Sequence, residues 1–233
     1  MKRKTRQHGP LEREARALLR DAIASARRLE PAYGALAAAA EVAIACLEGG
    51  GTVYLCGNGG SAADAQHLAA ELAGRYLLDR PALAAVALST NSSSLTAIGN
   101  DYGFDQVFSR QLEGLGVPGD VLIAISTSGG SANVLRAVET AHQLGMTVIG
   151  MTGAKGGRFA GVCDIALVTP SPSTPRIQEG HITLGHALCE LIERALFARR
   201  RSPVKPRARR AAAGAPTRAA RGKTARRRKR GRP

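Results

Sequence analysis

The sequence predicts an α/β fold: a doubly wound, mostly five-stranded parallel sheet flanked by helices, with two N-terminal helices and a disordered basic C-terminal tail. Three observations predict it. Short apolar runs recur along the middle of the chain, stretches of helical pattern separate them, and the runs lack the polar alternation of a sheet with one face in water. Strands of that kind belong to parallel sheets that are covered on both faces.

Two helices are expected before the first strand. Residues 11–29 and 33–48 are rich in Ala, Leu, Arg and Glu, and three glycines at 49–51 end the second stretch. This composition favours amphipathic helices, and the glycines mark a helix end.

The alternating part of the chain begins after these glycines. Apolar runs predict strands at 52–56, 82–88, 121–125, 147–151 and 165–168. Helical patterns follow them at 61–74, 92–98, 104–114, 131–144 and 175–198. In a doubly wound sheet ligands bind beyond the carboxyl ends of the strands, so the loops after the strands are the places to look for chemistry.

Length and charge divide the chain into three parts. The 233 residues suffice for one domain of ordinary size, expected at 11–198 after a flexible N-terminus at 1–10. The tail at 199–233 holds 16 of the 33 Lys and Arg side chains and no acid, which leaves a nearly neutral body. The tail has almost no large apolar residues and is expected to be disordered.

The compartment predicted from the sequence is the cytoplasm. No run of eighteen apolar residues occurs, and the basic start leads into a charged segment instead of a signal peptide. The cysteines lack CxxC spacing and stand in apolar stretches, which is typical of reduced core thiols: Cys46, Cys56, Cys163 and Cys189.

Two glycine-rich loops are suited to a phosphate. The first, CysGlyAsnGlyGlySer at 56–61, joins the first strand to a helix, although such a turn by itself is often only a turn. The second, at 125–133, contains four hydroxyls, whereas a helix cap needs one: Ser126, Thr127, Ser128 and Ser131. Neither loop matches the P-loop or dinucleotide patterns, which favours a small phosphate ester.

Two helices carry candidate metal and acid–base groups. His67 and Glu71 are four residues apart and share one helix face, where they form either a cation site or a surface ion pair. Gln178 and His186 on the last helix are eight residues apart and lie about 80° apart around its axis. His181 stands between them as a competing ligand or a packed core side chain.

Five motifs in this order resemble the sugar isomerase (SIS) domain, specifically the phosphoheptose isomerases. They are GlyAsnGlyGlySer with AspAlaGlnHis and GluLeuAlaGlyArgTyr, GlyAsnAspTyrGlyPhe at 99–104, SerThrSerGly, and ArgIleGlnGlu at 176–179. The resemblance covers about residues 11–198. It implies a carbohydrate-metabolism enzyme of heptose biosynthesis that converts sedoheptulose 7-phosphate to D-glycero-D-manno-heptose 7-phosphate through an enediol.

The resemblance also implies roles for individual residues. A zinc ion, or another divalent ion, is expected on His67, Glu71, Gln178 and His186, with Glu71 and His186 also catalytic. Substrate contacts are expected at Asn58, Gly59, Gly60, Asn100, Asp101, Ser126, Thr127, Ser128, Ser131 and Gln178. On local sequence alone, Asn100 and Asp101 read as a turn before a glycine. Members of the group form homotetramers with sites near subunit interfaces, and the two leading helices are expected to pack there.

Two rival functions use the same fold. The closer one is a non-enzymatic SIS scaffold that binds a replication initiator and promotes DNA replication; in such proteins the acid–base residues are lost, whereas this chain keeps them. The basic tail at 199–233 is expected to bind nucleic acid or another polyanion nonspecifically, or to serve only as a solubilising extension. A phosphosugar-sensing regulator ranks last, because no helix-turn-helix precedes the first strand.

Overall fold

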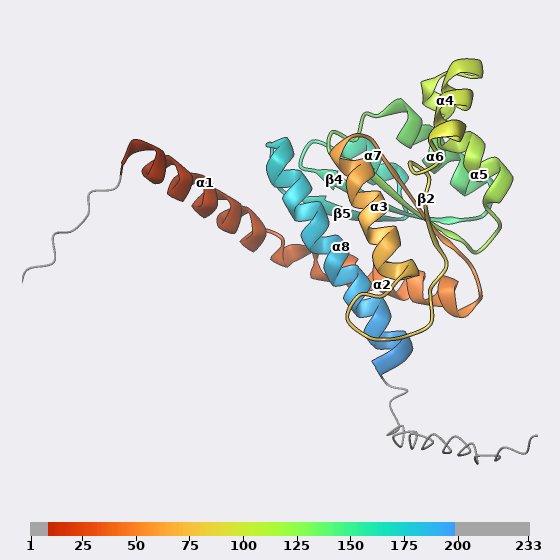
Figure 1. The fold of residues 1–233 in the computed structure, drawn as a ribbon, viewed down its shortest axis with the longest axis horizontal. Helices are drawn as coiled ribbons and strands as arrows, with labels where there is room; N and C mark the ends of the chain where they lie inside the picture. Colours follow the sequence, from red (N-terminus) through yellow and green to blue (C-terminus); the bar gives the residue numbers. More distant parts are fainter. Residues whose placement is uncertain (1–8, 199–233) are drawn as a thin grey trace, which may run out of the picture. The chain divides into compact units, whose positions relative to one another are not determined.

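The computed structural model describes residues 9–198, so the predicted tail at 199–233 and most of the predicted flexible N-terminus lie outside the described residues. Five parallel strands form one sheet in the order β2-β1-β3-β4-β5, with helices on both faces (Figure 1). The strands are β1 (Val53–Gly57), β2 (Ala85–Ala87), β3 (Val121–Ser126), β4 (Thr147–Gly153) and β5 (Ile165–Thr169). This confirms the predicted fold class.

Eight α-helices and two short 3-10 helices surround the sheet in the described part of the chain. They are α1 (Pro10–Arg27), η1 (Glu30–Ala32), α2 (Tyr33–Glu48), α3 (Gly60–Ala73), α4 (Ser92–Asp101), η2 (Phe104–Gln106), α5 (Ser109–Leu115), α6 (Ala132–Gln143), α7 (Gly157–Val162) and α8 (Thr174–Phe197).

The structure differs from the predicted helices in two places. The helix predicted at 104–114 is divided into η2 and α5 by Val107 and Phe108, which are both buried in the core. The six-residue α7 was missed, since its Gly-rich sequence has a weak helical pattern and only the fold places Phe159 in the core.

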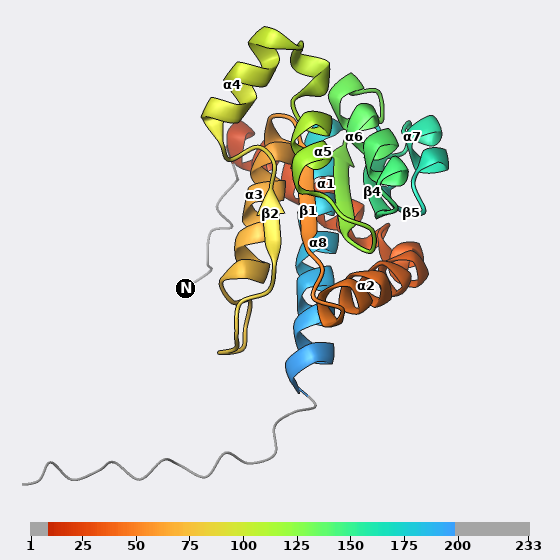
Figure 2. The same ribbon diagram turned by 90° about the vertical axis from the view of Figure 1, so that its right-hand side faces the viewer.

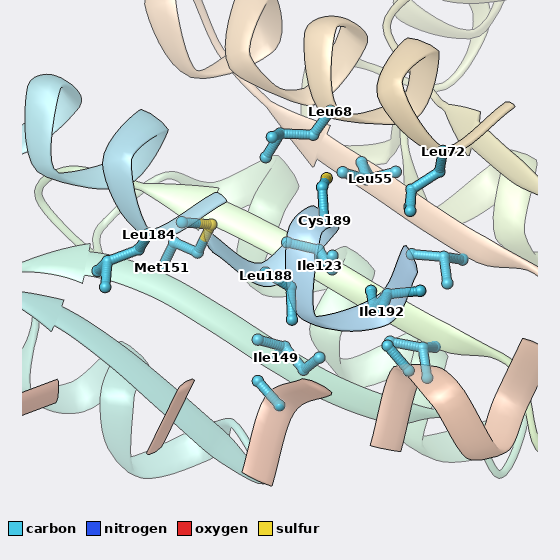
Figure 3. Packing of buried hydrophobic residues seen from close by; sticks show 14 of the residues in the cluster. Leu55, Leu68, Leu72, Ile123, Ile149, Met151, Leu184, Leu188, Cys189 and Ile192 are labelled. Carbon is cyan, nitrogen blue, oxygen red and sulfur yellow. The ribbon is translucent and has the colours of Figure 1, made fainter. Parts of the chain in front are cut away.

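Each face of the sheet has its own hydrophobic core. On one face α2, α3 and α8 bury a cluster that contains Leu55, Leu68, Ile123, Leu184 and Leu188 (Figure 3). On the other face α5, α6 and α7 cover a second cluster. The alternation of side chains along each strand divides the apolar residues between the two cores. Helices α3 and α8 pack against each other on one face.

The strand order reverses direction between β1 and β3. From β1 the chain moves to β2 at one edge of the sheet, visible beside β1 in Figure 2, and then returns to β3 on the other side of β1. A crevice forms at such a switch point, beyond the carboxyl ends of the two strands. The two loops that the sequence marked for phosphate follow these two strands, and so flank the crevice.

The N-terminal helices differ in how they are buried. Residues 10–48 are long and apolar enough to cross a membrane by length and composition, but Ala39, Ala40 and Ala43 of α2 pack against the sheet. Only 28% of the most apolar window of this segment is buried, so packing against the sheet accounts for part of the apolar character of α2. In contrast, α1 is attached to α8 through Arg176, which donates to the Leu18 carbonyl, and leaves its apolar side chains exposed.

Candidate active site

Three predicted ligands converge between α3 and α8. The Nε2 atoms of His67 and His186 are 2.7 Å apart, and His67 Nε2 is 3.4 Å from Glu71 Oε1. One ligand atom from each of the three residues lies within 4.8 Å of the others. The helical spacing brings His67 and Glu71 together, whereas only the packing of α8 against α3 adds His186.

The two helices approach closely at a glycine. A Cβ atom at Gly185 would lie 2.6 Å from a methyl group of Leu68, so a larger residue there would force the helices apart. Gly185 and Leu68 each neighbour a cluster histidine in sequence. On the open side, the Tyr76 ring lies 5.7 Å from the His186 ring, centroid to centroid.

The donor set fits a divalent cation. Two imidazole nitrogens and one carboxylate oxygen suit zinc, whose tetrahedral ligand atoms stand roughly 3.3 Å apart when the bonds are about 2.0–2.1 Å. The 2.7 Å and 3.4 Å separations bracket that value, so a bound ion requires only a small outward movement of the imidazoles.

The fourth predicted ligand, Gln178, lies beside the first glycine-rich loop. Its side-chain amide packs directly on Gly60, where an added Cβ would overlap it. Gln178 is partly buried on the first turns of α8, and Gly60 begins α3. The lack of a side chain at Gly60 therefore makes room for Gln178 at the same end of α3 as the predicted sugar contacts.

Asp64 is an acidic group near the cluster that the sequence reasoning missed. It lies one turn before His67 on α3, and its buried Oδ2 has no hydrogen-bond partner among the described residues. Burial raises its pKa, and the nearby His67 and His186 oppose that rise. The DxxH spacing on one helix face is a signal that could have identified it.

The second glycine-rich loop is held by hydrogen bonds among its own residues. Ser126 Oγ lies 3.1 Å from Ser131 Oγ and accepts a hydrogen bond from the Gly129 amide. The Ser131 side chain does not cap α6. The start of this helix therefore presents backbone amides and a positive dipole end toward the loop.

Beside this loop is a cavity of about 220 Å³. Thr127 and Ser128 line it, together with Lys155 from the loop after β4, Ser171 from the loop before α8 and Thr174 at the start of α8. Lys155 is the only lysine in the described part of the chain. Sequence reasoning missed it because the β4 loop has no phosphate pattern of its own, and only the fold brings that loop to the serines.

The two glycine-rich loops are joined by a pair of amides. Asn58 Nδ2 donates to Asn133 Oδ1, and Asn133 Nδ2 donates to Asn58 Oδ1, both at 2.8 Å. Asn58 precedes α3, whereas Asn133 is in the first turn of α6 and is only 3% exposed. Asn133 was missed because nothing in the local sequence distinguishes it from any other polar helix residue.

Asn100 and Asp101 are in a different setting. They are the last two residues of α4, both exposed, and Asn100 Nδ2 donates to Asp101 Oδ1 at 2.8 Å. The structure thus puts them in a helix instead of the turn that the local sequence suggested. The described contacts do not join them to the histidine cluster.

A buried ion pair ties the far end of α3 to α8. Arg80 Nε donates to Glu193 Oε2 at 2.8 Å, and both side chains are at most 2% exposed. The guanidinium also donates to the carbonyls of Glu71 and Leu72 at the end of α3, at 2.8 and 2.9 Å. Glu193 accepts three backbone amides of the following segment, those of residues 76–78. Together they fix α3 relative to the helix that carries His186.

His181 is a core residue and not part of the cluster. It is fully buried, and neither ring nitrogen has a hydrogen-bond partner among the described residues. Burial lowers its pKa to about 4, so the ring is neutral at pH 7. This supports the packed alternative that the sequence left open for it.

Comparisons with known proteins identify the family of the chain. The SIS domain family matches residues 18–153 and, with a second description of the same domain, residues 114–193. The phosphoheptose isomerase of Rhodospirillum rubrum is 58% identical over 186 residues, which is 80% of this chain and 99% of that protein. That of Trichlorobacter lovleyi is 53% identical over 180 residues, or 77% of this chain and 92% of the other.

Solved structures give the same result. The phosphoheptose isomerase of Neisseria gonorrhoeae superimposes with a TM-score of 0.74 at 49% identity, covering 78% of this chain and 98% of the other. That of Francisella tularensis gives 0.75 at 40% identity, covering 78% and 97%. These comparisons lend no support to the scaffold alternative. The chain belongs to the SIS domain family and, within it, to the phosphoheptose isomerases.

Proposed function

We propose that the isomerase reaction of this chain, sedoheptulose 7-phosphate to D-glycero-D-manno-heptose 7-phosphate, takes place at the cluster formed by His67, Glu71 and His186, with Gln178 as a fourth cation ligand. The observation that carries the proposal is the convergence of two imidazoles and a carboxylate from α3 and α8 within 4.8 Å. An aldose–ketose isomerisation needs a base, an acid and a means of stabilising an oxyanion, and this set provides all three.

Glu71 is the base that moves the proton between C1 and C2 of the open-chain sugar. His186 protonates the substrate oxygen as the enediol forms and collapses. Zinc, when bound, polarises the carbonyl as a Lewis acid, and the donor set also accepts other divalent ions. A carboxylate on a cation is a weaker base, so Glu71 acts as ligand and as base at different stages of the cycle.

The remaining site residues hold the substrate. Ser126, Thr127, Ser128 and Ser131 bind the phosphate together with the amides at the start of α6. The turn at 58–60 contacts the sugar. Asn100 and Asp101 bind sugar hydroxyls, and their exposure at the end of α4 agrees with a site that is completed near a subunit interface.

Glu71→Gln tests the catalytic assignment. This variant keeps the size and polarity of the side chain but cannot take up the proton, so we expect turnover to be lost while phosphosugar binding, measured by calorimetry, survives. Glu113→Gln is the matched control, since Glu113 pairs with Arg110 on the exposed surface of α5 and should leave turnover unchanged. Retained turnover in Glu71→Gln would contradict the assignment.

We also propose a cytoplasmic homotetramer. Leu11, Leu18, Leu19 and Ile23 of α1 are between 55% and 80% exposed, and their spacing of seven, one and four residues places them on one helix face. A second copy of the chain would cover this face. Sedimentation of Leu18→Glu should show dissociation; an unchanged tetramer would contradict the role of α1.

The basic segment 199–233 lies outside the described residues, and we propose that it binds nucleic acid or other polyanions nonspecifically. Its 16 positive charges would act through counterion release, so retention on DNA should fall steeply with salt. Deleting it should leave the isomerase activity intact and reduce DNA retention at low salt. Loss of isomerase activity would show that the segment belongs to the folded enzyme.

A further inference from the structure

The reciprocal amide pair of Asn58 and Asn133 stands at the switch point of the sheet. Asn58 follows β1 in the turn that leads into α3, and Asn133 is in the first turn of α6, which follows β3. The pair thus joins the 58–60 turn to the start of α6, directly after the loop at 126–131, through side chains.

Its geometry is that of a closed two-bond ring. Each amide donates one hydrogen bond and accepts one, both at 2.8 Å. Each therefore keeps one N–H and one oxygen lone pair unused by the pair. The two partners differ in burial: Asn133 is 3% exposed, whereas Asn58 is partly exposed. Only Asn58 is accessible to a ligand in the crevice.

We propose that Asn133 is a positioning residue: it holds Asn58, and with it the 58–60 turn, at a fixed separation from the phosphate loop, so that one phosphosugar can contact both. Asn133 touches no substrate itself. Its effect on catalysis passes through Asn58, because the buried amide restrains the exposed one. A sugar phosphate must satisfy both loops at once, whereas inorganic phosphate needs only the loop at 126–131.

Two consequences separate positioning from a merely structural role. Losing the amide pair should weaken the binding of the phosphosugar substrate much more than the binding of inorganic phosphate. In addition, if Asn133 acts only through Asn58, removing Asn133 should cost nothing further once Asn58 is gone. A general loss of packing in α6 would instead add to the effect of the Asn58 change.

The test compares Asn133→Ala, Asn58→Ala and the double variant in the full-length, metal-loaded enzyme. For Asn133→Ala we expect kcat/KM for sedoheptulose 7-phosphate to fall about tenfold to a hundredfold, because Asn58 loses both hydrogen bonds that hold it in place. Its inhibition constant for inorganic phosphate should change by less than about threefold, a smaller loss because that ion needs no second loop. The double variant should match Asn58→Ala in kcat/KM.

Thr140→Val is the matched control, since Thr140 is a buried polar residue of the same helix outside both loops; it should leave kcat/KM unchanged. The proposal would be overturned if the losses of kcat/KM in the two single variants added up in the double variant. It would also be overturned if Asn133→Ala weakened the binding of substrate and of inorganic phosphate equally. An Asn133→Ala enzyme with wild-type kcat/KM would overturn it as well. Thermal unfolding identifies any variant that fails to fold; where Asn133→Ala fails, Asn133→Ser, which is uncharged and too short to complete the amide pair, replaces it in the same cycle.

Discussion

Removing the Glu193 carboxylate should be among the most destabilising single changes in this domain. Glu193 accepts hydrogen bonds from Arg80 and from the backbone amides of Tyr76, Leu77 and Leu78, all between 2.8 and 3.0 Å. In Glu193→Ala the Arg80 guanidinium, 1% exposed, would keep its charge without a counterion. Breaking a buried pair in this way costs about 3–5 kcal/mol, a large share of the roughly 5–15 kcal/mol that stabilises a domain.

The measurement is urea unfolding followed by far-ultraviolet circular dichroism at one protein concentration, because the chain contains no Trp and an oligomer's stability depends on concentration. Glu190→Gln is the control on the same helix. Because its partner Arg194 is 69% exposed, this variant should lose less than about 1 kcal/mol in the free energy of unfolding. Equal losses in the two variants would refute the reasoning.

The same pair predicts an acid dependence. Burial raises the pKa of Glu193, but the three backbone amides and Arg80 outweigh it and hold the pKa below its ordinary value. The pair's contribution is therefore fully present above the ordinary glutamate pKa and is lost as the pH falls through the lowered folded-state pKa. Glu193→Gln should flatten that part of the stability curve. Arg80 also donates a hydrogen bond to the Glu71 carbonyl. The affinity of the proposed cation site for zinc, measured by chelator competition, should therefore also fall in Glu193→Gln.

Three further predictions each concern the substitution of a single residue. Burial lowers the pKa of His181 from 6.5 to about 4. The free energy of unfolding of the wild type should therefore fall by up to about 3 kcal/mol as the pH falls from 6.5 toward 4. Acid unfolding curves of His181→Gln should lack this fall. Gly129 has a φ of +68°, and an added Cβ would lie 2.8 Å from Gly156 Cα. Gly129→Ala should therefore deform the loop at 126–131. In steady-state assays this variant should raise KM with a smaller effect on kcat. Lys155→Gln should raise KM about tenfold and leave kcat unchanged if the ammonium neutralises bound phosphate; an unchanged KM would place Lys155 outside the site.

Sequence patterns within single helices, strands and loops were enough to predict the fold class, one pair of candidate ligands and the two glycine-rich loops. Strand runs without polar alternation fixed a buried parallel sheet, since only such a sheet hides both faces of every strand. Helical spacing paired His67 with Glu71, and the glycines and hydroxyls after β1 and β3 identified the two loops of the switch point. The motif order identified the family, and the comparisons confirmed it.

Contacts between distant elements were decided only by the tertiary structure. Nothing near Asn133 or Glu193 in the sequence signals a role, because Asn58, the partner of Asn133, is 75 residues away and Arg80, the partner of Glu193, is 113 residues away. Lys155 lines one cavity with Thr127, which is 28 residues away in the sequence. Likewise, His186 joins His67 only because Gly185 lets α8 approach α3. A sequence pattern records the chemistry that one element offers, whereas the packing of side chains in the two cores decides which elements meet and at what distance.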